Sequence, residues 1–174
     1  MITMDLKEVN NTVLVIGKTE GHIDQSLFAR NILNEKNGPP PEINLFNEKN
    51  NGETLLKLMN AGHVKSAHDV SIGGIITAVS KMCIKGNKGI KLKKPKYLIN
   101  EIQYYFAEDQ GRYIIEVSHD SLQKVTDILN KNAVHFDELG TINDDQLIID
   151  EKTKVTIDEL RTFNTNWLPN YIGK

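Results

Sequence analysis

The residues best suited to chemistry lie together in one short segment, His68–Gly74 (HDVSIGG). It follows a predicted strand and precedes a predicted helix, whose first N–H groups have no intrahelical partner and favour an anion. Ser71 can donate to a phosphate oxygen, and Asp69 can ligate a magnesium ion that bridges phosphates. Two glycines let the backbone approach a ligand closely. The predicted nucleotide contacts are therefore Asp69, Ser71, Gly73 and Gly74, with Asp69 as the metal ligand. The structural alternative is that Asp69 or Ser71 only caps the helix while the glycines form a turn.

A second acidic group is formed by the neighbours Glu108 and Asp109. Such a pair can act in metal or proton chemistry, but neighbours in sequence seldom share a face. We expect turn capping with an ion pair to Arg112 instead. No catalytic residue is assigned, because the remaining histidines lack the spacing of a metal site. They are His22, His63, His119 and His135.

Several other residues have competing interpretations. Gln25, Ser26 and Arg30 either contact a ligand or serve as a helix cap and a surface arginine. Trp167 is expected to anchor the C-terminal tail against the body rather than to stack on a base. The single cysteine, Cys83, falls in an apolar helical stretch, which indicates a buried structural thiol in a reducing compartment.

Apolar patterning predicts the elements that must position these residues. Strands are expected at residues 12–16, 64–67, 104–106, 112–117, 137–141 and 146–149. Helices are expected at residues 21–33, 55–61, 73–84, 122–129 and 158–163, with an irregular tail after the last. The run Pro39–Pro41 predicts an extended, exposed connection. Strands and helices alternate irregularly, so we predict an α+β fold with a mixed sheet covered by helices.

Size and composition favour one globular domain. A chain of 174 residues can bury roughly two thirds of the surface that it exposes when unfolded. The net charge of −2 provides no global field for polyanions, and a local group of lysines is interpreted as a solvated loop. That group is Lys85, Lys88, Lys91, Lys93, Lys94 and Lys96. There is no basic leader and no run of about 18 apolar residues. We therefore expect a cytoplasmic protein with no nucleic-acid or membrane partner.

Several motifs together resemble one enzyme superfamily. Ala67–Ser71 with Gly73–Gly74, followed by an apolar helix, is similar to the C-terminal-domain signature of the aminoimidazole ribonucleotide synthetase superfamily. Within that group, Phe106–Tyr113 (FAEDQGRY) resembles the small, bacterial-type phosphoribosylformylglycinamidine synthase. Three further segments resemble this enzyme, in order along nearly the whole chain: Gly21–Ile32, Pro39–Pro41 and Trp167–Tyr171.

The resemblance implies that residues 1–174 form a single C-terminal-type synthase domain, a fragment of a longer enzyme. The complete enzyme converts formylglycinamide ribonucleotide to its amidine in purine biosynthesis. It uses ATP and Mg²⁺, with ammonia taken from glutamine by a separate glutaminase subunit. ATP phosphorylates the amide oxygen, and ammonia then displaces phosphate. The implied partners are the remaining domains of the synthase, the glutaminase subunit and a small accessory subunit.

The departures from the family pattern lead to further expectations. Ile72 stands where the family usually has Asp, which removes a carboxylate from the turn. Ala107 replaces a usual Gly, which requires that this position not adopt positive φ. The catalytic histidine and the main ATP and magnesium residues of the family lie in N-terminal domains, so we expect the isolated chain to be inactive. The rival interpretations are a non-catalytic structural or subunit-binding module, and a lobe of another superfamily member such as thiamine monophosphate kinase or selenophosphate synthetase. The segment 108–113 and the C-terminal tail weigh against the second rival.

Overall fold

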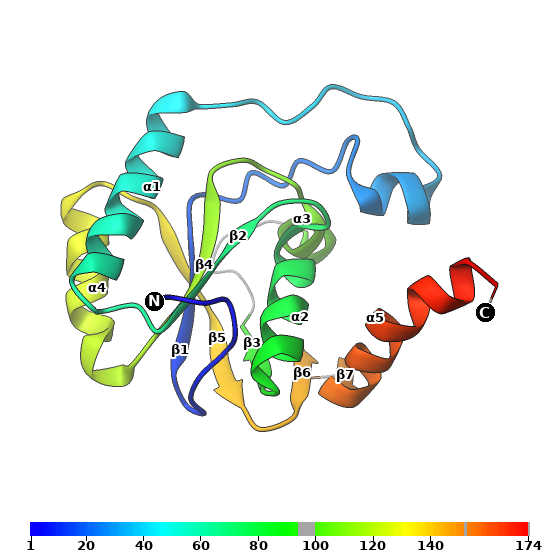
Figure 1. Ribbon diagram of the computed structural model, residues 1–174. Coiled ribbons are helices and arrows are strands. Elements are labelled where there is room, and N and C mark those ends of the chain that lie inside the picture. The colour runs from blue at the N-terminus through cyan, green and yellow to red at the C-terminus, as the bar shows by residue number, and fades with distance from the viewer. Residues whose placement is uncertain (94–99, 152, 174) are drawn as a thin grey trace.

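The computed structural model describes residues 1–93, 100–151 and 153–173. Within them, a seven-stranded sheet carries helices on both faces (Figure 1). Its strands, in spatial order, are β2 (Ser66–Val70), β4 (Arg112–Val117), β1 (Thr12–Ile16), β5 (Phe136–Asn143), β3 (Gly89–Leu92), β6 (Gln146–Ile149) and β7 (Thr153–Thr156). Neighbouring strands are antiparallel except for the parallel pair β3 and β6. This mixed sheet confirms the predicted α+β class. Lys94 and Lys96 of the predicted basic group lie outside the described residues.

Strand β1 lies inside the sheet between β4 and β5 and is buried along its whole length. Its run of β-branched and leucine side chains serves both faces, as predicted for a buried strand. It pairs with β4 from Thr12 opposite Val117 to Ile16 opposite Tyr113. Its pairing with β5 shifts register between Val13 and Leu14. The residues that follow β1 lie near the start of α1, because Gly17 and Leu45 line the same hollow.

Helices α1 (Leu45–Asn60) and α4 (His119–Lys131) cover one face of the sheet. Their apolar side chains pack against those side chains of β1 and β4 that point toward this face. Together they form one core cluster, which includes Leu14, Ile16, Leu55, Leu58, Ile115, Val117, Val125 and Leu129. Asn44 caps α1, because its side-chain oxygen accepts a hydrogen bond from the backbone N–H of Asn47. Gly62 follows the helix with φ of +75°, the left-handed ending that the sequence predicted.

Helices α2 (Gly74–Gly86), α3 (Glu101–Phe106) and α5 (Ile157–Tyr171) lie on the other face. The second core cluster lies beneath them and includes Val13, Val15, Ile75, Val79, Met82, Ile114 and Ile142. Cys83 is fully buried in this cluster, which confirms the structural thiol. Burial raises the pKa of its thiol to about 12, so thiolate chemistry is suppressed at neutral pH.

The carboxylate of Glu116 holds the N-terminal segment against the sheet. Glu116 is fully buried on β4. It accepts hydrogen bonds from the backbone N–H groups of Lys7 at 2.8 Å and Glu8 at 3.0 Å. The side chains of Asn11 and Ser66 donate two more, at 2.7 and 3.0 Å. Four donors compensate the loss of water around this charge.

Some predicted elements were wrong. Residues Tyr104–Phe106 belong to helix α3 and not to a strand. Asn100 caps that helix by accepting from the N–H of Ile102, and Tyr104 and Tyr105 are buried on the α2 side, so local capping and packing override the β preference of aromatic residues. The helix expected at 21–33 is reduced to η1 (Ala29–Leu33), a short π-helical turn.

Other boundaries differ from the prediction. Strand β2 continues to Val70 because Ser66–Val70 pair fully with β4, so half of the candidate turn is strand. Strands β3 and β7 were not predicted: Lys91, interpreted as part of a solvated loop, lies in β3, and Val155 is the one apolar residue of β7. The expected irregular tail is the helix α5, which begins with a capping box between Thr156 and Glu159.

Candidate functional site

The predicted turn lies between an edge strand and a helix, as the sequence indicated. Strand β2 is the last strand of the sheet on its side, and α2 starts four residues after it ends. Ser71 and Ile72 are exposed, and Ile72 keeps 61% of its surface in water. The position where the family usually has Asp therefore faces solvent, with an apolar side chain in place of a carboxylate.

The side chain of Asp69 is accessible and lies beside an imidazole. It is 63% exposed, and its Oδ1 lies 3.0 Å from Nδ1 of His68. Nε2 of His68 is buried and has no hydrogen-bond partner among the described residues. Across the strand pair, Asp69 lies opposite Tyr113. Burial raises the pKa of the Tyr113 hydroxyl, and the nearby carboxylates of Glu48 and Asp69 raise it further.

The backbone N–H groups of both glycines of the turn already have internal partners. The N–H of Gly73 donates to Oε1 of Glu108 at 2.9 Å, and the N–H of Gly74 donates to the carbonyl of Ser71 at 3.0 Å. The same Glu108 oxygen accepts the N–H of Leu27 at 2.8 Å. A carboxylate of the chain itself thus occupies the start of α2, where a negative charge is favoured. Glu108 has the capping role that we expected of the acidic pair.

Both glycines of the turn are required by the fold. Gly73 has φ of +84°, and a Cβ there would lie 2.2 Å from Oγ1 of Thr77. Gly74 has φ of +70°, and its Cβ would lie 2.6 Å from the carbonyl oxygen of Ala107. Such conformations and distances exclude a side chain without rearrangement. Ala107 itself has φ of −61°, so its replacement of a glycine costs no backbone strain, as expected.

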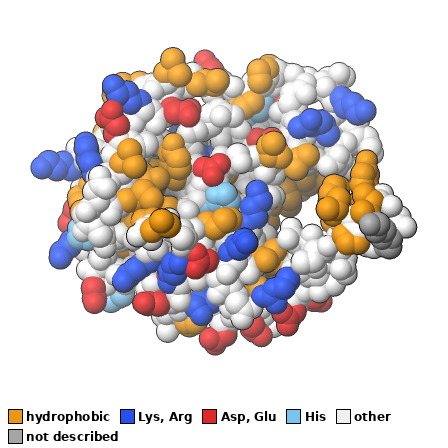
Figure 2. Space-filling model, in the orientation of Figure 1, with side chains coloured by type: hydrophobic (Ala, Val, Ile, Leu, Met, Phe, Trp, Pro, Cys, Tyr) orange, Lys and Arg blue, Asp and Glu red, His pale blue; other side chains and the backbone are white. Residues whose placement is uncertain are grey.

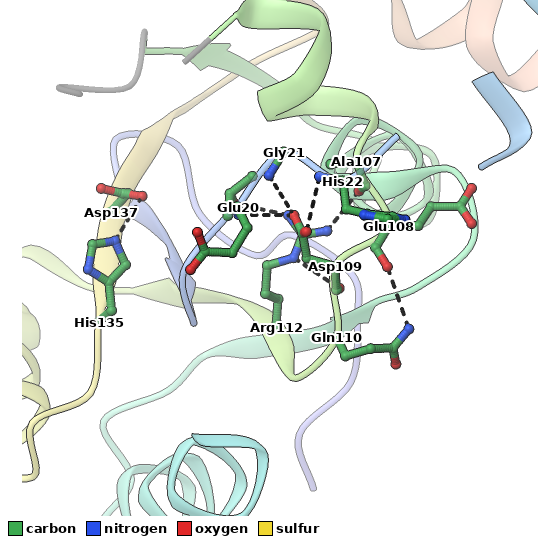
Figure 3. Close-up of polar contacts among 11 residues, drawn as sticks. Glu20, Gly21, His22, Ala107, Glu108, Asp109, Gln110, Arg112, His135 and Asp137 are labelled. Carbon is green, nitrogen blue, oxygen red and sulfur yellow. Dashed lines mark hydrogen bonds and ion pairs between the residues drawn. The ribbon is translucent and has the colours of Figure 1, made fainter. Parts of the chain in front are cut away.

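Asp109 ties the turn between α3 and β4 to the segment that follows β1 (Figure 3). Its Oδ2 accepts the backbone N–H groups of Glu20 and Gly21, each at 3.2 Å. Its Oδ1 accepts the N–H of His22 at 3.1 Å. Asp109 is 6% exposed, so these three hydrogen bonds replace its water.

Arg112 is the counter-charge of this turn and is 1% exposed. Its Nη1 lies 3.8 Å from Oδ2 of Asp109, and its Nε donates to the Asp109 carbonyl at 3.2 Å. It also donates to Oγ1 of Thr19 at 3.0 Å and to the carbonyl of Ala107 at 2.7 Å. The expected ion pair between this acidic turn and Arg112 is confirmed, and we call the pair Asp109–Arg112 the buried clamp.

Asp109 of the buried clamp forms part of the wall of a hollow of about 860 Å³, which the sequence did not predict. Its lining comes from the segment after β1, the loop before α1, the first turns of α1, the Asp109 turn and the loop between α4 and β5: Gly17, Lys18, Glu20, His22, Glu42, Ile43, Asn44, Leu45, Asn47, Glu48, Asn51, Asp109, Gln110, Ala133 and His135. Lys18, the one lysine of this lining, lies 2.8 Å from Oε1 of Glu20. The lining is thus rich in carboxylates and matches a phosphate poorly.

The residues near η1 with two competing interpretations make contacts that fit their structural roles. The hydroxyl of Ser26 is buried and accepts the N–H of Ala29, the first residue of η1, at 3.1 Å, which is a structural role. The side-chain amide of Gln25 donates to the carbonyls of Lys36 and Gly38 and fastens the loop before Pro39. Arg30 is exposed, as the surface alternative required.

Neither a metal cluster nor a membrane helix is present in the part of the chain that the structure describes. No group of three or more His, Cys, Asp and Glu side chains there could hold a metal ion. None of the helices described is long and apolar enough to cross a bilayer.

The fold and the two turns define a member of a known enzyme-domain family. Residues 8–151 match the family described as "AIR synthase related protein, C-terminal domain", and the chain belongs to this family. It is 72% identical over 172 residues to the phosphoribosylformylglycinamidine synthase subunit PurL of Pelagibacter ubique, covering 99% of this chain and 24% of that protein. It is 33% identical over 174 residues to the PurL subunit of Bartonella henselae, covering 100% of this chain and 24% of that protein. The chain thus spans about a quarter of the length of these relatives.

Solved structures share the fold at low sequence identity. PurL of Thermotoga maritima complexed with FGAR superposes with a TM-score of 0.73 at 18% identity, covering 92% of this chain and 29% of that one. The same protein complexed with ATP gives a TM-score of 0.68 at 17% identity, covering 92% and 27%. Thiamine-monophosphate kinase from Stenotrophomonas maltophilia gives 0.58 at 13% identity, covering 86% and 53%.

Proposed function

We propose that this chain is the C-terminal lobe of phosphoribosylformylglycinamidine synthase, a single domain over residues 1–174. The observation that carries the proposal is 72% identity to the Pelagibacter subunit along 99% of the chain. Identity at this level leaves little room for a change of chemistry within the matched part. The weaker likeness to thiamine-monophosphate kinase, at 13% identity, supports only a shared fold.

The proposed reaction replaces the amide oxygen of formylglycinamide ribonucleotide (FGAR) with nitrogen. ATP supplies a phosphoryl group that turns this oxygen into a good leaving group, and ammonia displaces it as phosphate. The products are the amidine, ADP and phosphate. The ammonia would come from a glutaminase subunit, and a small accessory subunit would complete a cytoplasmic assembly; a solved PurLQS structure from Thermotoga maritima supports partners of this kind.

Within the lobe, Asp69 and Ser71 are the proposed contacts to magnesium-bound nucleotide. Both are exposed at the end of an edge strand. Magnesium is commonly held by one or two carboxylates together with phosphates and water, so a single Asp69 fits this ion. Gly73 and Gly74 would allow close approach rather than donate, because their N–H groups are bonded to Glu108 and Ser71.

A non-catalytic module is the second candidate, and one observation favours it. The start of α2 is already capped by Glu108, which makes two hydrogen bonds through the same oxygen. A lobe of this kind would shape the enzyme and bind its other domains without touching nucleotide.

The experiment is to replace the matching 172 residues of the Pelagibacter subunit with this chain and to measure amidine formation from FGAR, ATP and ammonia. The chimaera is expected to retain the activity of the parent subunit, and the isolated chain to show none above background. An inactive chimaera that is folded and binds its partners would contradict the proposal. Turnover by the isolated chain would contradict the expectation that the lobe is incomplete.

A further inference from the structure

The two halves of α5 differ in how they meet the rest of the molecule. In the first half, Ile157 is buried and Leu160 packs against the core cluster of the α2 face. From Phe163 onward, the large apolar side chains of α5 and that of its C-cap residue Ile172 are exposed by more than half of their surface: Phe163, Trp167, Leu168, Tyr171 and Ile172. This half projects from the body (Figure 1). The expectation that Trp167 anchors the tail against the body was therefore wrong.

The exposed aromatic residues form one ordered stripe. Phe163, Trp167 and Tyr171 recur every four residues and so lie along one side of the helix. The rings of Trp167 and Tyr171 stack, with centroids 5.3 Å apart and planes 10° from parallel. A shallow hollow of about 490 Å³ runs along the same residues, together with Thr162, Asn166 and Asn170. Figure 2 shows these hydrophobic side chains gathered at the right edge of the molecule. We call Phe163, Trp167 and Tyr171 the aromatic stripe.

The chemistry of the stripe indicates a protein partner. The sequence has no charged residue from Thr162 to Gly173. Helices that lie on anionic membranes carry lysine or arginine on the polar face, and nucleic-acid surfaces need basic residues, so neither partner fits. Aromatic residues enriched on one surface and free of charge are typical of the centre of protein interfaces.

The size of the relatives indicates where the partner surface lies. The chain covers only 24% of the Pelagibacter subunit while 99% of the chain is matched. Three quarters of that polypeptide therefore lies outside the part that matches this chain. Because it is covalently linked to the matching part, its surface is present at high local concentration. A patch that contacts such a surface can remain apolar without causing aggregation.

We propose that the aromatic stripe of α5 docks onto a part of the synthase polypeptide outside this domain, an inference that rests on the proposed function. Docking would bury the stacked rings of Trp167 and Tyr171 against an uncharged apolar surface. Because the two rings are already stacked, little side-chain freedom would be lost on docking.

The test compares Phe163→Ser and Trp167→Ser in two contexts: this chain alone, and the Pelagibacter subunit carrying this chain in place of its matching residues. The matched control is Phe46→Ser, because Phe46 is 77% exposed and Phe163 is 76% exposed. In the chain alone, all three variants are expected to leave the melting temperature unchanged to within about 2 °C. In the full subunit, the two stripe variants are expected to lower it by at least about 3 °C, and Phe46→Ser to leave it unchanged.

Three results would overturn the docking proposal. These are no fall in the full subunit, an equal fall for Phe46→Ser, or a fall of the same size in the chain alone. Sedimentation of the chain alone tests the competing occupant: a dimer that the stripe variants dissociate would identify a second copy instead. Amidine formation by the unmutated chimaera is measured separately. If the stripe variants lower the melting temperature of a chimaera that forms no amidine, the proposed function is contradicted and the docking proposal is supported.

Discussion

Two turns of the molecule carry an aspartate a few residues before a glycine, and they differ in what surrounds the carboxylate. Asp109 is 6% exposed and is satisfied by three backbone N–H groups and Arg112. The side chain of Asp69 is 63% exposed, and its Oδ1 lies beside the imidazole of His68. The first carboxylate is committed to holding the fold, and the second remains free to meet a ligand.

The turns that contain Asp69 and Asp109 thus have separate physical roles, although both belong to segments that resemble the same family. A buried charge persists only where donors or an opposite charge compensate its lost water, and each compensating bond then fixes a segment of chain. The buried clamp in this way fixes Glu20–His22, part of the wall of the hollow. An exposed carboxylate fixes no comparable segment of chain, and the role proposed above for Asp69 is ligand contact.

The largest expected effect is the loss of the buried clamp. Arg112→Met should destabilise the domain by about 3–5 kcal/mol, because it leaves Asp109 buried without its counter-charge. Urea unfolding at neutral pH measures this change. The control is Arg161→Met, whose arginine pairs with the exposed Asp158 and should cost less than about 1 kcal/mol. Equal losses of unfolding free energy for the two arginine variants would show that the Asp109 turn is no more structural than an exposed ion pair.

The next effect concerns the glycine of the exposed turn. Gly73→Val should cost about 2–3 kcal/mol, because residue 73 has positive φ and its Cβ would overlap Oγ1 of Thr77. This loss needs no ligand, so Gly73→Val cannot by itself reveal nucleotide binding. In Gly73→Ala combined with Thr77→Ala, part of the loss should return, since the overlapping hydroxyl is gone. A double variant no more stable than Gly73→Ala would show that backbone strain alone limits the position.

The smallest expected effect on stability is that of Asp69→Asn. The side chain is exposed and the substitution keeps its shape, so the free energy of unfolding should change by less than about 0.5 kcal/mol. Urea unfolding of the isolated chain measures it beside Asp109→Asn, in which an amide replaces a buried acceptor of three N–H groups. A loss above about 2 kcal/mol for Asp69→Asn would place Asp69 among the structural residues.

The sequence predicted those parts of the fold where apolar pattern and local turn signals agree. The run Thr12–Ile16 is buried on both faces, so its composition alone identified β1. The stripe of α2 and the left-handed Gly62 were likewise local signals. The strand predicted at Tyr104–Phe106 was wrong, because these residues form a helix that depends on the cap from Asn100 and on packing against α2.

The site could be predicted only where neighbours in sequence form it. His68–Gly74 was found because strand, turn and helix follow one another there. The link from Glu108 to the start of α2 joins residues 35 positions apart, and no local pattern announces it. The hollow beside Asp109 gathers residues from distant segments for the same reason. Trp167 was misassigned because its aromatic pattern shows an apolar face but not what covers that face.

The most direct test of the difference between the two turns is a calorimetric titration of Mg²⁺ and ATP into the full chimaeric subunit, with thermal unfolding of the same samples. We predict that Asp69→Asn combined with Ser71→Ala weakens nucleotide binding at least about tenfold, equivalent to ~1.4 kcal/mol, while the melting temperature stays within about 2 °C of the parent. Unchanged nucleotide affinity together with a lower melting temperature would contradict the account, because the turn would then be a cap and nothing more.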